Sequence, residues 1–127
     1  MGFDPFMKVA FELAKKAHAA DIRPNPFVGA VVVSPEDEII GRGFHKKYGE
    51  PHAEVYAINE ALSNRTDLSD CTLYVTLEPC SHFGNTPPCT DFIIKHRLKK
   101  VVIGSKDFDK RVNGIEILRK ANIDTII

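Results

Sequence analysis

Helix-like and strand-like segments alternate along almost the whole chain, and this alternation constrains the fold more than any other sequence feature. The first helix-like segment, residues 4–21, starts with Asp4 as N-cap and Pro5 at the first helical position. Residues 24–33 break this helix and lead into a buried strand that ends near Ser34. The remaining expected strands are residues 39–45, 72–77, 99–104 and 123–127, and the remaining expected helices are 53–63, 90–97 and 114–121.

The order of these elements predicts an α/β fold. A mixed five-stranded sheet covered by helices on both faces gives a three-layer α/β/α architecture. The first two strands should form a hairpin, and the last three, each reached through a helix, should run parallel. Within helix 53–63, Val55, Ile58 and Leu62 should face the core. Ligands of such sheets bind outside the carboxyl ends of the strands, where helices begin.

The composition suits a globular protein that acts on a small molecule. The 127 residues are enough for one domain with a single core. Lys+Arg and Asp+Glu both number 17, so the basic excess typical of nucleic-acid binding is absent, and a small diffusible ligand is favoured. The sequence has no apolar run of membrane-spanning length and no signal-peptide pattern, which favours a soluble, cytoplasmic protein.

Two short motifs place metal-binding side chains at the ends of expected elements. In "PHAEV", His52 and Glu54 lie at the start of helix 53–63, and in "LEPC", Cys80 follows strand 72–77, with Cys89 further on. One His and two Cys suit zinc, and three protein ligands leave a fourth coordination position open. Glu54 would reach a water at that position and move its protons without binding the metal. The motifs therefore predict a hydrolytic zinc site.

A closed structural zinc site is the alternative interpretation. Its fourth ligand would be Cys71 or His82. Such a site would leave Glu54 without a role, and Cys71, at the start of a strand, is more simply a small buried residue. The number of protein ligands separates the two interpretations.

His-x-Glu followed by Pro-Cys is the signature of the zinc-dependent cytidine-deaminase superfamily, most members of which carry both cysteines as Cys-x-x-Cys. This chain has "CSHFGNTPPC" instead, and it closely resembles the diaminohydroxyphosphoribosylaminopyrimidine deaminases, the deaminase domains of bacterial riboflavin biosynthesis. The resemblance covers nearly the whole chain. It also rests on the stretches "RPNPFVGAVVV", "GRGFH", "GEPHAEVYAI", "TLYVTLEPC" and "KKVVIGSKD".

The resemblance implies a cytidine-deaminase-like fold and the hydrolytic deamination of 2,5-diamino-6-(5-phosphoribosylamino)pyrimidin-4(3H)-one, with release of ammonia. It implies zinc as cofactor, with His52, Cys80 and Cys89 as ligands and Glu54 as the catalytic proton carrier. Asn25 and the backbone of Ala53 would hold the pyrimidine edge, and His45 would lie near the sugar or the phosphate. The remaining implied substrate contacts are His82, Thr86, Asp107 and Asp109, of which the first two would lie near the phosphate.

Two positions depart from the pattern of these deaminases. Asn85 stands where the family usually carries a basic residue that resembles a phosphate partner, and Asp109 stands where it carries an Asn that resembles a substrate contact. The zinc ligands are unaffected by these changes. An alternative function is therefore the same chemistry on a different amino-substituted heterocycle or nucleobase.

The resemblance also bears on domains and partners. Relatives commonly continue into a reductase domain, which this sequence lacks, so residues 1–127 are expected to form a single deaminase domain. A separate reductase is then a candidate partner. Because the superfamily commonly assembles as dimers or tetramers, a homo-oligomer is expected, with no nucleic-acid or membrane partner.

Overall fold

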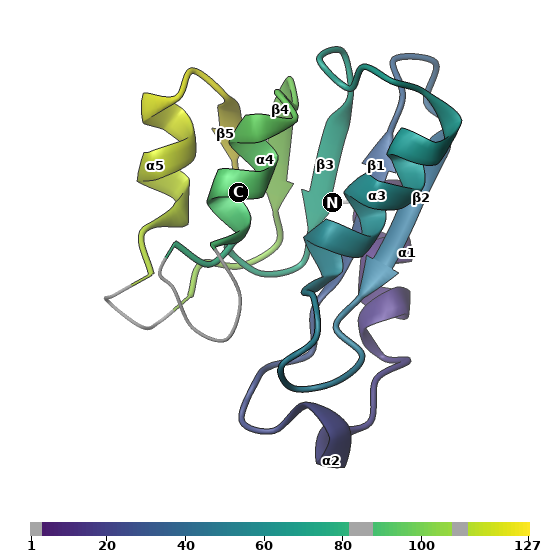
Figure 1. Ribbon diagram of the computed structural model, residues 1–127, viewed down its shortest axis with the longest axis vertical. Helices are drawn as coiled ribbons and strands as arrows, with labels where there is room; N and C mark the ends of the chain where they lie inside the picture. The colour runs from purple at the N-terminus through teal and green to yellow at the C-terminus, as the bar shows by residue number, and fades with distance from the viewer. Residues whose placement is uncertain (1–3, 82–87, 108–111) are drawn as a thin grey trace.

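The computed structural model describes residues 4–81, 88–107 and 112–127, which form a five-stranded sheet with helices on both faces (Figure 1). The strand order is β2-β1-β3-β4-β5. The strands are β1 (Gly29–Val33), β2 (Ile39–Phe44), β3 (Thr72–Val75), β4 (Lys100–Ile103) and β5 (Asp124–Ile126). The helices are α1 (Pro5–Ala14), α2 (Ala19–Ile22), α3 (Ala53–Asn64), α4 (Cys89–Lys95) and α5 (Gly114–Lys120). This arrangement confirms the predicted α/β fold with a mixed sheet.

The strand directions bring the carboxyl ends of β3 and β4 to one edge of the sheet. β1 pairs antiparallel with β2 and with β3, whereas β3, β4 and β5 run parallel. The hairpin and the three parallel strands are therefore as predicted. The chain leaves β3 toward Cys80 and leaves β4 toward Asp107, so these two residues follow the ends of neighbouring parallel strands.

β1, which lies between β2 and β3, is buried on both faces. Val31 and Val33 pack with Leu13 of α1, whereas Ala30 and Val32 belong to the larger core cluster that includes residues of α3, α4 and α5. Alternate residues of a strand point to opposite faces, so β1 joins the two helical layers. In Figure 1, α3, α4 and α5 lie in front of the sheet and α1 lies behind it.

The expected first helix, residues 4–21, is wrong in its extent. The observed helix α1 ends at Ala14, and the short helix α2 begins only at Ala19. A continuous helix would carry Ile22 about 12 Å beyond Ala14 along its axis. The break lets Ile22 return to the interior, where its side chain is 1% exposed.

α3 lies unusually close to β2 because glycines of the strand face alanines of the helix. A Cβ atom at Gly41 would collide with the backbone carbonyl of Ala57, and one at Gly43 with that of Ala53. Of the three residues expected to face the core, Ile58 is fully buried, whereas Val55 and Leu62 are only half-buried. The close approach fixes the start of α3, where His52 and Glu54 lie.

None of the helices in the described ranges is long and apolar enough to cross a bilayer.

Candidate active site

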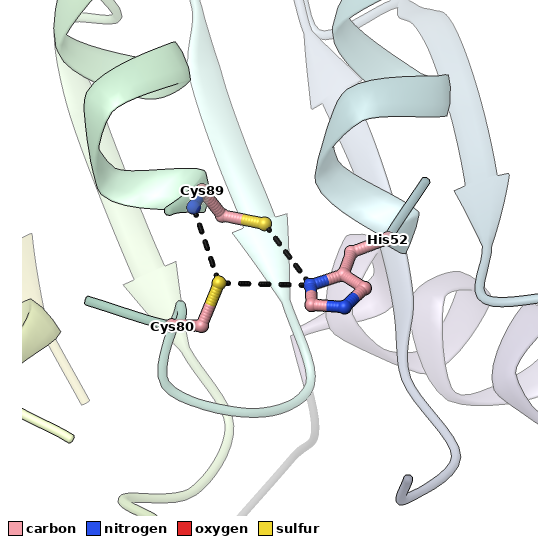
Figure 2. Close-up of side chains that lie close together, drawn as sticks. All are labelled: His52, Cys80 and Cys89. Atoms are coloured by element: carbon pink, nitrogen blue, oxygen red, sulfur yellow. Dashed lines mark hydrogen bonds between the residues drawn. The ribbon is translucent and has the colours of Figure 1, made fainter. Parts of the chain in front are cut away.

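Three metal-binding side chains meet where three elements begin or end. His52 directly precedes α3, Cys80 lies in the turn after β3, and Cys89 is the first residue of α4 (Figure 2). The Nδ1 atom of His52 lies 3.3 Å from Sγ of Cys89 and 3.6 Å from Sγ of Cys80. All three donor atoms lie within 4.8 Å of one another.

This donor set fits a zinc ion. Zinc–nitrogen and zinc–sulfur bonds in a tetrahedral site place neighbouring donor atoms about 3.6 Å apart. The distances from His52 Nδ1 to the two thiol sulfurs have this size. A His and two Cys are the ligands that zinc prefers.

The described residues supply three ligands rather than the four of a closed structural site. In the described ranges, His52, Cys80 and Cys89 are the group of three or more His, Cys, Asp or Glu that could hold a metal ion. Cys71 lies just before the start of β3, at the opposite end of that strand from Cys80, and its thiol contacts Arg65 and Asp70. His82, the other candidate for a fourth ligand, lies outside the described residues.

The two thiols differ in their electrostatics. The backbone N–H of Cys89 donates to Sγ of Cys80 over 3.1 Å. Hydrogen bonds from the Cys89 thiol, and then from His52, lower the pKa of Cys80 to about 4. The same bond to Cys80, together with burial, raises the pKa of Cys89. Cys80 is therefore held as a thiolate, the form that binds a metal.

Glu54 is buried beside this group with one oxygen unsatisfied. The residue is 3% exposed, and its Oε1 has no hydrogen-bond partner among the described residues. Burial, and then the negative charge of Cys80, raises the pKa of Glu54 to about 7. A buried carboxyl oxygen without a partner is costly. A buried carboxyl group of this kind beside a metal-binding group is typical of a general acid–base residue.

A cavity of about 180 Å³ opens onto these side chains. Its walls include six of the residues predicted from the sequence to act at the site: Asn25, His45, His52, Glu54, Cys80 and Asp107. The other lining residues are Pro26, Val28, Leu77, Glu78 and Val112. The fold thus gathers residues from several separate segments around one cavity.

The other predicted site residues are distributed differently. Cys89 reaches the site through its sulfur contact with His52, and Ala53 is fully buried at the start of α3. His82, Thr86 and Asp109 lie outside the described residues, as does Asn85.

His45 is buried and holds two neighbouring segments together. Its side chain is 2% exposed, its Nε2 lies 3.0 Å from Nδ2 of Asn25, and its Nδ1 lies 3.2 Å from the carbonyl oxygen of Pro51. Burial lowers the pKa of His45 and thereby favours the neutral ring. Nδ1–H then donates to Pro51, and Nε2 accepts from the Asn25 amide. The ring also packs edge-on against His52, at 5.0 Å between centroids.

Glu78 lines the cavity and was not predicted from the sequence. It lies three residues after the end of β3 and two residues before Cys80, and it is 6% exposed. The signal that could have found it is its position, an acidic residue at the end of an apolar strand and directly before the Pro-Cys pair.

The sequence and the fold are similar to those of known proteins. Residues 4–105 match the profile of a family described as the cytidine and deoxycytidylate deaminase zinc-binding region. The diaminohydroxyphosphoribosylamino-pyrimidine deaminase of Buchnera aphidicola (subspecies Schizaphis graminum) is 44% identical over 124 residues, which cover 96% of this chain and 81% of that protein.

Two longer proteins are also similar. The riboflavin biosynthesis protein RibD of Aquifex aeolicus is 50% identical over 121 residues, which cover 94% of this chain but 33% of that protein. A crystal structure from Thermotoga maritima, named as a diaminohydroxyphosphoribosylaminopyrimidine deaminase and 5-amino-6-(5-phosphoribosylamino)uracil reductase, has a TM-score of 0.88 and 52% identity. The match covers 95% of this chain and 34% of that one. This chain therefore spans about a third of the length of these two relatives.

Proposed function

The chain belongs to the zinc-binding cytidine and deoxycytidylate deaminase family, and from this premise we propose that it catalyses the deamination step of riboflavin biosynthesis. The reaction is the hydrolysis of 2,5-diamino-6-(5-phosphoribosylamino)pyrimidin-4(3H)-one at C2, with release of ammonia. Support comes from the Buchnera relative, which bears the name of this deaminase and most of whose length the chain spans. The observation that carries the chemistry is the unsatisfied Oε1 of Glu54, buried beside three zinc-type donors.

Glu54 moves the protons of the reaction. A zinc ion held by His52, Cys80 and Cys89 would supply the Lewis acidity that makes water a nucleophile near neutral pH. Glu54 accepts a proton from the attacking water and delivers it to the ring nitrogen beside C2. It then passes the second proton of that water to the amino group, which leaves as ammonia while the ring keeps the oxygen as a carbonyl.

The walls of the cavity bind the pyrimidine. Asn25 and the backbone of Ala53 hold its polar edge, and Asp107 is a further substrate contact. His45 lies near the sugar or the phosphate, and its 3.0 Å contact with the Asn25 amide supports a place beside the residue that holds the ring. His82 and Thr86 bind the phosphate, and Asp109 completes the contacts.

The substrate is tested by ammonia release from a panel of amino-substituted rings. The zinc-loaded protein is given the phosphoribosylated diaminopyrimidinone and its dephosphorylated form, with cytosine, guanine and a pterin in parallel. We expect turnover that depends on the phosphate. Faster turnover of any other ring would replace the proposed substrate and would leave the zinc chemistry standing.

The assembly and location form part of the same proposal. The longer relatives include a protein named as both deaminase and reductase, which supports a reductase activity as the partner that consumes the product. A homo-oligomer and a cytoplasmic location complete the proposal. Analytical sedimentation of the zinc-loaded protein tests directly whether it forms a homo-oligomer.

A further inference from the structure

Both carboxylate oxygens of Glu78 are engaged by backbone N–H groups. Oε1 accepts from the N–H of Asp107 and Oε2 accepts from the N–H of Ile115, each over 3.1 Å. Asp107 follows β4, and Ile115 lies in the first turn of α5. One buried side chain therefore binds the backbone both of the segment that follows β4 and of the first turn of α5.

Further contacts join the same two segments. The N–H of Glu78 donates to the carbonyl oxygen of Ser105 over 2.9 Å, and Oγ of Ser81 accepts from the N–H of Asn113 over 2.8 Å. Gly114 packs so closely on the turn that a Cβ atom there would collide with the carbonyl oxygen of Pro79. The segment 78–81, which carries Cys80, is thus held by contacts with residues 105–107, after β4, and with residues 113–115, at the start of α5.

This junction links the metal side of the cavity to another of its walls. Cys80 belongs to the predicted zinc ligands, whereas Asp107 and Val112 line the cavity without belonging to the metal-binding group. We propose that Glu78 is a positioning residue for the reaction: its carboxylate holds the wall formed by Asp107 and Val112 against the zinc site and thereby controls substrate binding. The kinetic part of this inference rests on the proposed deamination, whereas its structural part does not.

The position requires a carboxylate rather than an amide of the same shape. A carboxylate accepts hydrogen bonds at both oxygens, whereas the amide of glutamine has a single acceptor oxygen. In Glu78→Gln, the NH2 group of the glutamine side chain would face one of the two backbone N–H groups. Both groups are donors, so no hydrogen bond could form between them. Glu60 offers a matched control, because its Oε1 also accepts a backbone N–H, that of Arg42 at 2.7 Å. Glu60 is exposed, and among the described residues its other oxygen has no such bond.

Hydrogen exchange of the zinc-loaded protein without substrate tests the structural part. In Glu78→Gln we expect the amides of Asp107 and Ile115 to exchange about tenfold faster or more, as expected for a lost hydrogen bond to a buried charge. Bound zinc should remain at one per chain. Glu60→Gln should leave both amides unchanged. Unchanged exchange in Glu78→Gln, or loss of its zinc, would overturn the proposal.

Steady-state kinetics test the functional part. For Glu78→Gln we expect KM to rise about tenfold or more and kcat to change less than KM, because the wall shifts while Glu54 and the zinc ligands stay in place. A Cβ atom at Gly114 would collide with the carbonyl oxygen of Pro79 and lie 3.4 Å from Cγ of Glu78, so Gly114→Ala should displace the same junction and raise KM in the same direction. A fall in kcat alone would overturn the proposal. If the wild-type protein releases no ammonia, the proposed function fails, and the exchange experiment still decides the role of Glu78.

Discussion

At the scale of single residues, Glu54 and Glu78 show how the partners of a carboxylate determine its role. Both are buried and both line the cavity. One oxygen of Glu54 has no partner in the described part of the chain, whereas both oxygens of Glu78 accept backbone N–H groups. The first carboxylate is therefore able to exchange protons with a bound molecule, and the second is suited to hold backbone in place.

Replacing Glu54 by glutamine should abolish proton transfer and leave the metal site intact. General acid–base catalysis contributes about 10²–10⁴-fold to a rate, so we expect kcat of Glu54→Gln to fall by about this factor. Zinc content, measured by atomic absorption, should stay at one per chain because Glu54 is not among the metal-binding donors. A variant that keeps most of its kcat would contradict the role given to Glu54.

Replacing His45 by phenylalanine should destabilise the protein through unpaired polar groups. The Asn25 amide and the Pro51 carbonyl would each lose a partner inside the protein. We expect the free energy of unfolding, measured with urea, to fall by about 1–3 kcal/mol. The same substitution at the exposed His18 should have little effect. Equal effects of the two substitutions would show that the His45 bridge contributes nothing to stability.

At the scale of elements, the close packing of α3 on β2 positions His52. Gly43→Ala should push the start of the helix outward and lower the free energy of unfolding by about 1–3 kcal/mol. Zinc affinity should fall as well, because His52 directly precedes this helix. Competition with a chromophoric chelator measures that affinity.

Gly49→Ala separates this effect from a general loss of stability. Gly49 has a φ of +86° and no atom within 4 Å of an added Cβ, so the substitution strains the backbone without displacing α3. Gly49→Ala should lower stability and leave zinc affinity unchanged. If both variants weaken zinc binding equally, the packing of α3 does not position His52.

The sequence predicted those parts of the fold that depend on local patterns. The element order and the sheet directions were confirmed, because burial on both faces of β1 leaves a continuous apolar run and each parallel strand needs a crossover. The break after Ala14 was missed because it depends on the packing of Ile22 in the interior, which the local sequence pattern does not indicate. The inner face of α3 was predicted only in part: Ile58 is buried in the core and Leu62 packs against it, whereas Val55 is only half-buried. Glycines in β2 let the small alanines of α3 approach the sheet most closely.

The same distinction applies to the site. His52, Cys80 and Cys89 could be predicted because metal ligands must be particular side chains near element ends, and the structure brings their donor atoms together. Glu78 was missed because its partners are backbone N–H groups, which no motif marks, so that only its position directly before the Pro-Cys pair could have indicated it. The assigned roles of Asn25, His45 and Asp107 stay predictions, although all three line the cavity.

At the scale of the whole molecule, the metal site adds to a core that already exists. The two apolar clusters contain none of the three ligands, and they join the sheet to its helices on both faces. When the free zinc concentration is 100 times the Kd, zinc binding stabilises the protein by about 2.7 kcal/mol. Chelation should therefore lower the free energy of unfolding by about this amount. Far-UV circular dichroism should still report a folded chain. Complete unfolding on chelation would instead indicate a structural zinc site.

The measurement that tests the central claim most directly is ammonia release from the phosphoribosylated diaminopyrimidinone at a series of zinc occupancies. The protein is stripped with a chelator and reloaded stepwise, and kcat is recorded against bound zinc per chain. The proposed site predicts no turnover in the stripped protein and a linear rise to a maximum at one zinc per chain. Full turnover in the stripped protein, or no ammonia at full occupancy, would contradict a zinc-dependent deaminase acting on this substrate.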